Sequence, residues 1–342
     1  MLRHVLCVLV LALCCCTSFC VTAEAEASSV PPAVGSGTPA EVSAQEEDVT
    51  ARTKTLEAAN KTEAAAISAK EALESATVAA DEVMKAARNV VDECKKGKTD
   101  KTVDLVHALH KALRKILLPP KKRVVGKKDP TLADIKNPEI RTQIEGAKKN
   151  ALPATSLLKD AVGKTAAPVK SADAPVQQAR AAVEKASEAL KNAAAGATEI
   201  LDVVRNVNGI ALKGSTAAVQ LHTALTKVAD VMKRISESLG TVLNLADDTL
   251  VLANSESASA GTQTEDEKFA NLTKTAKNIL DDFDALMSEA ENVTDAADAA
   301  LTAADAVVTE VTAAEPEAAA AVKAATTAKA AARDALTQAE GA

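Results

Sequence analysis

The fold is decided by residues 221–246, LHTALTKVADVMKRISESLGTVLNLA, where apolar residues recur at alternating intervals of three and four. This spacing places the apolar side chains in one seam along a helix, as in coiled coils. The same rhythm reaches back to Val176 without interruption. These residues therefore predict a long helix with one buried stripe.

A second seam with the same spacing begins at Phe269. Residues 254–264 are rich in Ser, Gly and Thr, and Thr264 with Glu267 forms the signature of a helix N-terminus. Two runs of similar length joined by a short polar loop predict an antiparallel, coiled-coil-like helical hairpin over 176–342, with arms 176–253 and 265–342. The Asn208-Gly209 pair is the point where the first arm could break.

Residues 50–94 have a heptad pattern of their own, so they could add a third helix to the hairpin and form a three-helix bundle. This pattern ends at Cys94, which is the one cysteine left after residue 23. A single thiol cannot form an internal disulfide. Cys94 is therefore either a packed apolar residue or an intermolecular disulfide in a homo-oligomer.

The composition excludes several classes of protein. The chain has 342 residues, of which 47% are hydrophobic, but roughly 22% are alanine and both Trp and Tyr are absent. Aromatic side chains normally supply large buried areas, ligand cages and base-stacking surfaces. We therefore expect thin, closely packed helices, and no nucleic-acid partner.

The N-terminus resembles a secretory leader. Residues 1–23 combine a short positive start, an apolar run and small residues before Glu24, which is the pattern of a signal peptide. Residues 24–49 are acidic, contain Pro31, Pro32 and Pro39, and predict a flexible, disordered stalk.

The leader also carries a family resemblance. The run Leu9-Val10-Leu11-Ala12-Leu13-Cys14-Cys15-Cys16, followed by Cys20-Val21-Thr22-Ala23, resembles the leaders of trypanosome surface mucins and related Ala/Ser/Val-rich surface proteins. The resemblance implies a parasite protein that is secreted or displayed on the cell surface. Such families usually end in a glycolipid-anchor signal, whereas residues 331–340 are charged and lack the expected apolar tail. We expect no transmembrane helix.

Three asparagines occur in N-glycosylation sequons: Asn60, Asn271 and Asn292. The motif often arises by chance, but a secretory leader makes it meaningful. Each asparagine also lies beside its apolar seam, where a glycan could point outward. The alternative is a solvated asparagine on a helix surface.

Residues 95–128 are strongly basic and include an amphipathic helix whose apolar face is formed by Leu105, Val106, Leu109, Leu113, Ile116 and Leu117. Such a helix can bind anionic lipid or a glycosaminoglycan. The candidate polyanion-binding residues are Lys111, Arg114, Lys115, Lys121, Lys122 and Arg123. Alternatively, the apolar face packs on the hairpin and the basic residues dock on the acidic second arm.

Residues 129–175 are predicted to form a proline-rich linker of short turns. Residues 119–175 contain seven of the 11 prolines, namely Pro119, Pro120, Pro130, Pro138, Pro153, Pro168 and Pro175.

The sequence contains no motif that predicts an enzyme, a cofactor or a metal site. His107 and His110 with Asp104 share a helical neighbourhood, but a structural zinc site normally needs four ligands. The aspartates Asp281, Asp282 and Asp284 indicate a solvated face. We therefore expect a non-enzymatic, secreted or surface-displayed helical glycoprotein that serves as an elongated scaffold or antigen at the host interface. The alternative function is membrane or polyanion binding through residues 101–123.

Overall fold

The computed structural model describes residues 39–99, 102–119, 129–193, 197–255 and 264–341. The chain divides into two units, Met1–Glu47 and Asp48–Ala342, and the second unit is described here by itself. Its described residues form α-helices and no strand. The all-α prediction is confirmed.

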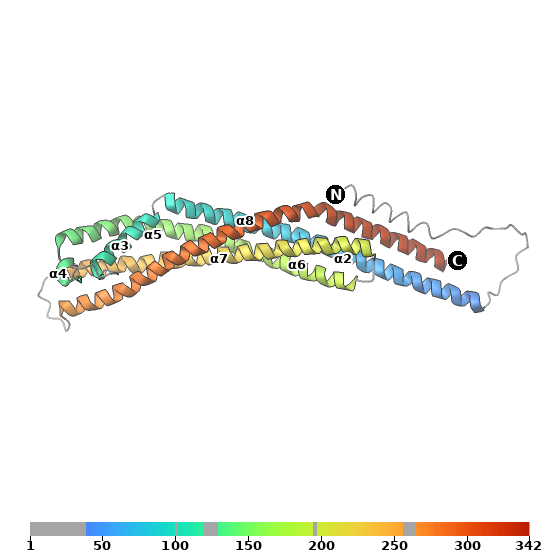
Figure 1. Ribbon diagram of the computed structural model, residues 1–342, viewed down its shortest axis with the longest axis horizontal. Coiled ribbons are helices and arrows are strands. Elements are labelled where there is room, and N and C mark those ends of the chain that lie inside the picture. The colour runs from blue at the N-terminus through green and yellow to red at the C-terminus, as the bar shows by residue number, and fades with distance from the viewer. Residues whose placement is uncertain (1–38, 100–101, 120–128, 194–196, 256–263, 342) are drawn as a thin grey trace, which may run out of the picture. The chain divides into compact units, whose positions relative to one another are not determined.

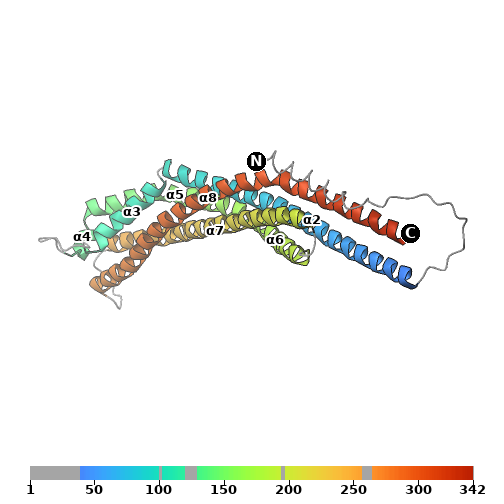
Figure 2. The ribbon, with the colours of Figure 1, turned by 45° about the vertical axis from the view of Figure 1, so that its right-hand side comes forward.

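The predicted hairpin is formed by α7 (Thr198–Asn254) and α8 (Glu265–Glu340), which lie alongside each other (Figures 1 and 2). Three polar pairs fix their direction: Arg234 with Glu289, Lys213 with Glu310 and Asn206 with Glu317. From one pair to the next, the residue number falls along α7 by as many residues as it rises along α8. The two helices are therefore antiparallel and keep one register.

The predicted start of the second arm is also confirmed. The backbone N–H of Glu267 donates to the Thr264 hydroxyl at 3.3 Å, and the backbone N–H of Thr264 donates to the Glu267 carboxylate at 3.0 Å. This reciprocal cap satisfies two backbone donors that a helix N-terminus leaves without intrahelical acceptors. Helix α8 therefore begins where the sequence signal lies.

The proline-rich segment differs from the prediction. Instead of a linker over 129–175, the structure has α4 (Leu132–Ile135), α5 (Pro138–Ser171) and the start of α6 (Asp173–Asn192). Pro138 occupies the first turn of α5, where a missing N–H costs nothing. Pro153 and Pro168 lie inside α5, and each removes one helical hydrogen bond.

Packing explains why α5 continues through these prolines. Ile144, Ala151 and Ala154 are fully buried within a core shared by α3, α5, α7 and α8. Lys148 also pairs with Asp247 of α7. Burial of one face along the whole helix outweighs the local cost of a proline. The prediction of a linker had taken only that local cost into account.

The first predicted arm, 176–253, is likewise two helices. α6 ends at Asn192 and α7 begins at Thr198, and the two run antiparallel. The side-chain amide of Asn208 donates to the Ser187 hydroxyl at 3.1 Å, which joins α7 to α6. The helix continues through Gly209, and the chain instead breaks between Asn192 and Thr198, about two heptads earlier than the Asn-Gly signal suggested. An unbroken heptad rhythm does not distinguish one helix from two that share a core.

Helices α2 (Pro39–Thr99) and α3 (Thr102–Leu117) complete the arrangement. Glu63 of α2 accepts from Lys329 of α8 at 2.7 Å, and Glu71 accepts from Lys185 of α6 at 3.3 Å. Among the described residues of this unit, four helical columns therefore alternate in direction: α2–α3, α5–α6, α7 and α8. The predicted three-helix bundle did not include the α5–α6 column, to which the proline-rich segment contributes α5.

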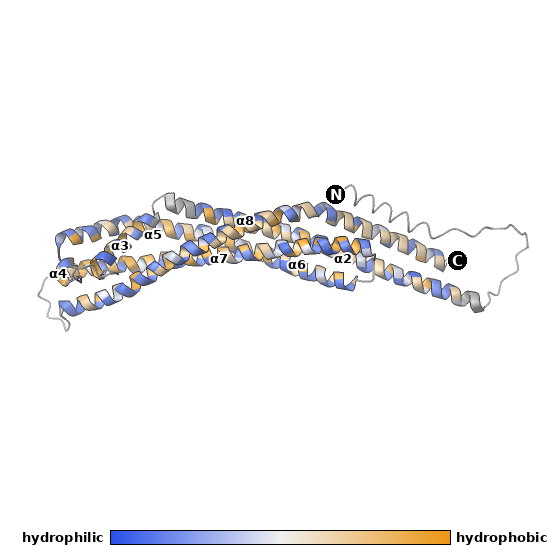
Figure 3. Ribbon diagram, in the orientation of Figure 1, coloured by the Kyte–Doolittle hydropathy of each residue, from blue (hydrophilic) through white to orange (hydrophobic). Residues whose placement is uncertain are grey.

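Hydrophobic and hydrophilic residues alternate along the described helices (Figure 3), and the size of the buried residues changes from one part of the bundle to another. One part contains large side chains from α3, α5, α7 and α8, with Phe283, Leu109 and Leu239 fully buried. Another part is lined mainly by alanines of α2, α6 and α8 and by branched aliphatic side chains of α7. Small side chains bring the helices close together: a Cβ atom on Gly214 would lie 2.8 Å from Val311 and 3.3 Å from Ala76.

Candidate functional sites

The three sequon asparagines all have exposed side chains on long helices, Asn60 on α2 and Asn271 and Asn292 on α8. Helices α5, α6 and α7 contain no sequon. Glycans on these asparagines would project from the α2 and α8 columns, where the outward helix faces leave room for a bulky group. Whether sugar is attached remains a prediction.

The threonine of each sequon is engaged with the backbone of its own helix. The hydroxyl of Thr62 donates to the Ala58 carbonyl at 2.9 Å, and only 1% of this residue is exposed. The hydroxyls of Thr273 and Thr294 donate to the carbonyls of Ala270 and Ala290 at 2.9 and 2.7 Å. In the folded chain, the Thr62 hydroxyl is therefore buried, and the hydroxyl protons of Thr273 and Thr294 are used in bonds within α8.

The basic amphipathic helix α3 packs on the hairpin, as one of the two sequence interpretations predicted. Its apolar side chains enter the core, and Val106, Leu109 and Leu113 are 0–2% exposed. Lys111 and Lys115 remain exposed. Lys121, Lys122 and Arg123 lie outside the described residues, and the Cys94 side chain also lies outside the described part of the chain.

Arg114 docks on the acidic arm instead of facing solvent. Its guanidinium lies 2.8 Å from Asp281 and 2.9 Å from Asp284 of α8. Hydrogen bonds from Lys277 and Arg114 lower the pKa of Asp281 below its usual range. Asp281 and Asp284 are thus ion-pair partners of α3, which corrects their assignment to a solvated face, and Arg114 is not available to a polyanion in this arrangement.

His110 joins the same two helices from inside the core. Only 3% of the residue is exposed, and its Nε2–H donates to the Leu280 carbonyl at 3.0 Å. Its ring lies 5.3 Å from the ring of Phe283. Burial lowers the pKa of His110 because the charged imidazolium would lose hydration, and this effect outweighs the opposing attraction of Asp284. His110 therefore positions α3 on α8 as a neutral donor.

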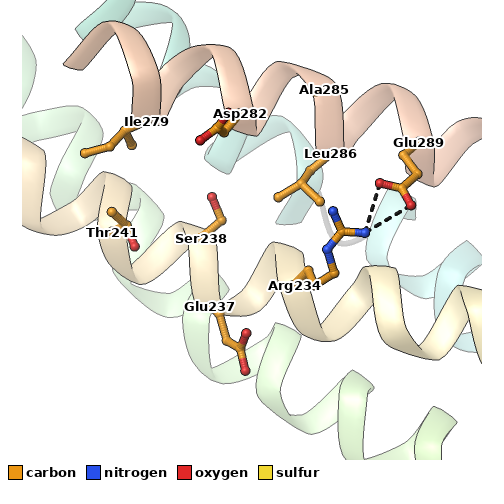
Figure 4. Close-up of a pocket in the computed structure, with 9 residues that line it drawn as sticks. All are labelled: Arg234, Glu237, Ser238, Thr241, Ile279, Asp282, Ala285, Leu286 and Glu289. Atoms are coloured by element: carbon orange, nitrogen blue, oxygen red, sulfur yellow. Dashed lines mark hydrogen bonds and ion pairs between the residues drawn. The ribbon is translucent and has the colours of Figure 1, made fainter. Parts of the chain in front are cut away.

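A shallow open groove of about 480 Å³ runs between α7 and α8 (Figure 4). Ser238 and Thr241 of α7 and Ala285 of α8 are small residues beside the apolar seam, so their side chains do not cover it. Arg234 closes one end through two 3.0 Å contacts to the Glu289 carboxylate. The heptad pattern does not predict this groove, because the groove depends on the size of the residues beside the seam and not on the seam positions themselves.

Two kinds of feature are absent from the residues that the structure describes. No group of three or more His, Cys, Asp or Glu side chains is arranged to bind a metal ion there. None of the described helices has a stretch long and apolar enough to cross a membrane.

Comparison with known proteins gives one match. A family model described as "Mucin-like glycoprotein" matches residues 1–104, which include the leader and the whole of α2. This finding confirms the resemblance to mucin-like surface proteins and extends it beyond the leader. Neither the curated proteins nor the solved structures gave a significant match. The similarity therefore points to a surface glycoprotein, and it concerns the N-terminal part of the chain.

Proposed function

We propose that this protein is a non-enzymatic helical glycoprotein of a parasite, secreted or displayed on the cell surface, that presents a helical scaffold at the host interface. The match of residues 1–104 to mucin-like glycoproteins is the observation that carries the proposal. The exposed side chains of Asn60, Asn271 and Asn292 support it, since a glycan on each would lie at the surface of the folded chain.

The packing of the helices suggests how such a scaffold would work. The large apolar residues lie mostly inside the bundle, while the outward positions are mostly polar, charged or alanine. A surface of this kind keeps a protein soluble and leaves its outward side chains free to contact a host protein, which we propose as the partner class. Glycans on the α2 and α8 columns would cover part of that surface.

The test is to express the full chain with an internal epitope in a trypanosomatid cell and to partition it between washed cell surface and medium. Intact mass on both fractions reports leader removal and added glycan. We expect the protein at the surface or in the medium, without residues 1–23 and heavier than the polypeptide. The matched control lacks residues 2–23 and should stay inside the cell without glycan. Intracellular retention of the full chain with its leader attached would contradict the proposal.

Membrane or polyanion binding through residues 101–123 receives less support from the geometry. The apolar face that would enter a lipid interface is packed in the core, and Arg114 is paired with Asp281 and Asp284. Pelleting of the full protein with anionic vesicles tests this alternative. We expect Lys111→Gln/Lys115→Gln to leave pelleting unchanged, and a loss of pelleting on this substitution would revive the membrane function.

A further inference from the structure

We infer that Asn60 is the main N-glycan acceptor of this chain, and that rapid packing of α8 on α7 limits glycan addition at Asn271 and Asn292. The inference rests on the proposed function, because it requires passage through the secretory pathway. In the reaction, the Asn amide nitrogen attacks the anomeric carbon of a lipid-diphosphate-linked oligosaccharide. The new C–N bond forms as the C–O bond to the diphosphate breaks, and the amide loses one proton.

Folding of each sequon competes with its modification. The transferring enzyme must reach both the asparagine and the sequon hydroxyl. In the folded chain, the Thr62 hydroxyl is bonded to the Ala58 carbonyl and is buried. The hydroxyls of Thr273 and Thr294 are bonded within α8. Each sequon is therefore an acceptor only before its helix has formed and packed.

Helix α2 is synthesised long before some of the helices against which it packs. The buried face of α2 packs against α6, α7 and α8, for example Ala66 and Ala69 in one cluster with Val183, Val204 and Val311. Val311 follows Asn60 by about 250 residues, which takes ~12–50 s to synthesise at typical rates. In proteins, most helical stability comes from tertiary packing, and an unpacked helix opens and closes locally in about a microsecond. The Asn60 sequon thus stays accessible for many seconds.

Helix α8, in contrast, is synthesised after the helices against which its sequons pack. The neighbours of the two α8 sequons, Leu272 and Val293, pack against core clusters that contain α7 residues. The whole of α7 precedes them in the chain, and Arg234 pairs with Glu289 close to Asn292. Helical contacts between neighbouring elements form in roughly microseconds to milliseconds, whereas adding one residue takes ~0.05–0.2 s. Helix α8 can therefore pack as fast as it emerges.

The experiment measures glycan occupancy at each site. The full chain is expressed in a eukaryotic secretory pathway, deglycosylated enzymatically in heavy-oxygen water, and the labelled fraction at each asparagine is read by peptide mass spectrometry. Short unfolded peptides containing each sequon, glycosylated in the same microsomes, correct for intrinsic acceptor strength. After this correction, we expect Asn60 occupancy to be at least about twice that of Asn292, since its folding delay is far longer.

Variants of α7 separate folding competition from position in the chain. Leu225 and Leu245 are buried residues of α7, and Leu→Ala at such sites costs about 2–5 kcal/mol. Leu225→Ala and Leu245→Ala should raise occupancy at Asn271 and Asn292 and leave Asn60 unchanged. The matched control is Leu212→Ala, because Leu212 is 52% exposed and its loss should change no site.

Equal corrected occupancy at the three sites, or no response to the α7 variants, would overturn the inference and leave the proposed function standing. Absence of glycan from all three sites in a protein that has lost its leader would refute the glycoprotein function itself. A variant that fails to fold still tests the inference. If packing limits glycan addition at Asn271 and Asn292, loss of packing must raise glycan occupancy at these two sites.

Discussion

Gly214 tests the close approach of α2, α7 and α8. A Cβ atom at this position would lie 2.8 Å from Val311 Cγ2 and 3.3 Å from Ala76 Cβ. In an open helix, replacing Gly by Ala stabilises by about 0.5–1 kcal/mol, because glycine loses more conformational freedom on folding. At Gly214 the added methyl must instead displace a buried valine with little rotamer freedom, and such overpacking costs about 1–3 kcal/mol.

Gly240→Ala is the matched control, since Gly240 lies in the same helix and has no atom within 4 Å of the added Cβ. Helix propensity cancels between the two variants, so their free energies of unfolding should differ by about 1–3 kcal/mol, with Gly214→Ala less stable. Urea unfolding followed by far-UV circular dichroism measures this difference. Tryptophan fluorescence is not an option because the chain contains no Trp.

A double-mutant cycle identifies the cause. In a Val311→Ala background the clashing Cγ2 atom is gone, so Gly214→Ala should cost less than in the wild type, with a coupling energy of about 1 kcal/mol or more. If Gly214→Ala stabilises the protein as much as Gly240→Ala, the three helices do not approach each other as described.

Three further changes should alter stability in defined directions. His110 has a lowered pKa, so between about pH 7 and pH 5 the unfolded chain takes up a proton that the folded chain resists; stability should fall over this range, and less steeply in His110→Gln. Arg114→Met should cost about 1 kcal/mol at neutral pH, and this difference should shrink in strong acid, as the pH falls through the lowered pKa of Asp281. Pro153→Ala should stabilise by about 1–2 kcal/mol because Pro153 is exposed inside α5 and withholds one helical hydrogen bond. Unfolding of each variant over a pH series checks all three, and a destabilised Pro153→Ala would mean that α5 is not a continuous helix.

The hairpin was predictable because local and tertiary signals agree there. The seams of α7 and α8, the polar loop between them and the Thr264–Glu267 cap all indicate the same two helices. Docking of the basic α3 on the acidic α8 was also predictable as one of two alternatives, since opposite charge and an apolar face both favoured it. Such agreement between levels is what makes a sequence interpretation reliable.

The proline-rich segment was not predictable by the same method. The cost of Pro153 and Pro168 is local and visible in the sequence, whereas the compensating burial of Ile144 and Ala151 depends on packing against α3, α7 and α8, which are separate helices of the chain. The break between α6 and α7 was not predicted either, for a related reason. Heptad spacing reports which face is buried and says nothing of how many helices share that face, so it cannot locate a turn that preserves the rhythm.

Residues inside the family match pack against residues outside it. The match ends at residue 104, but the buried face of α2 contacts α6, α7 and α8, all of which lie outside it. Ala76 shows this dependence directly, because its Cβ atom would lie only 3.3 Å from a Cβ atom added to Gly214 of α7. Alanine buries little surface, so α2 gains stability only where such close partners are present along much of its length. The mucin-like N-terminal part and the unmatched remainder therefore stabilise each other, and any surface role of the first depends on the second being folded around it.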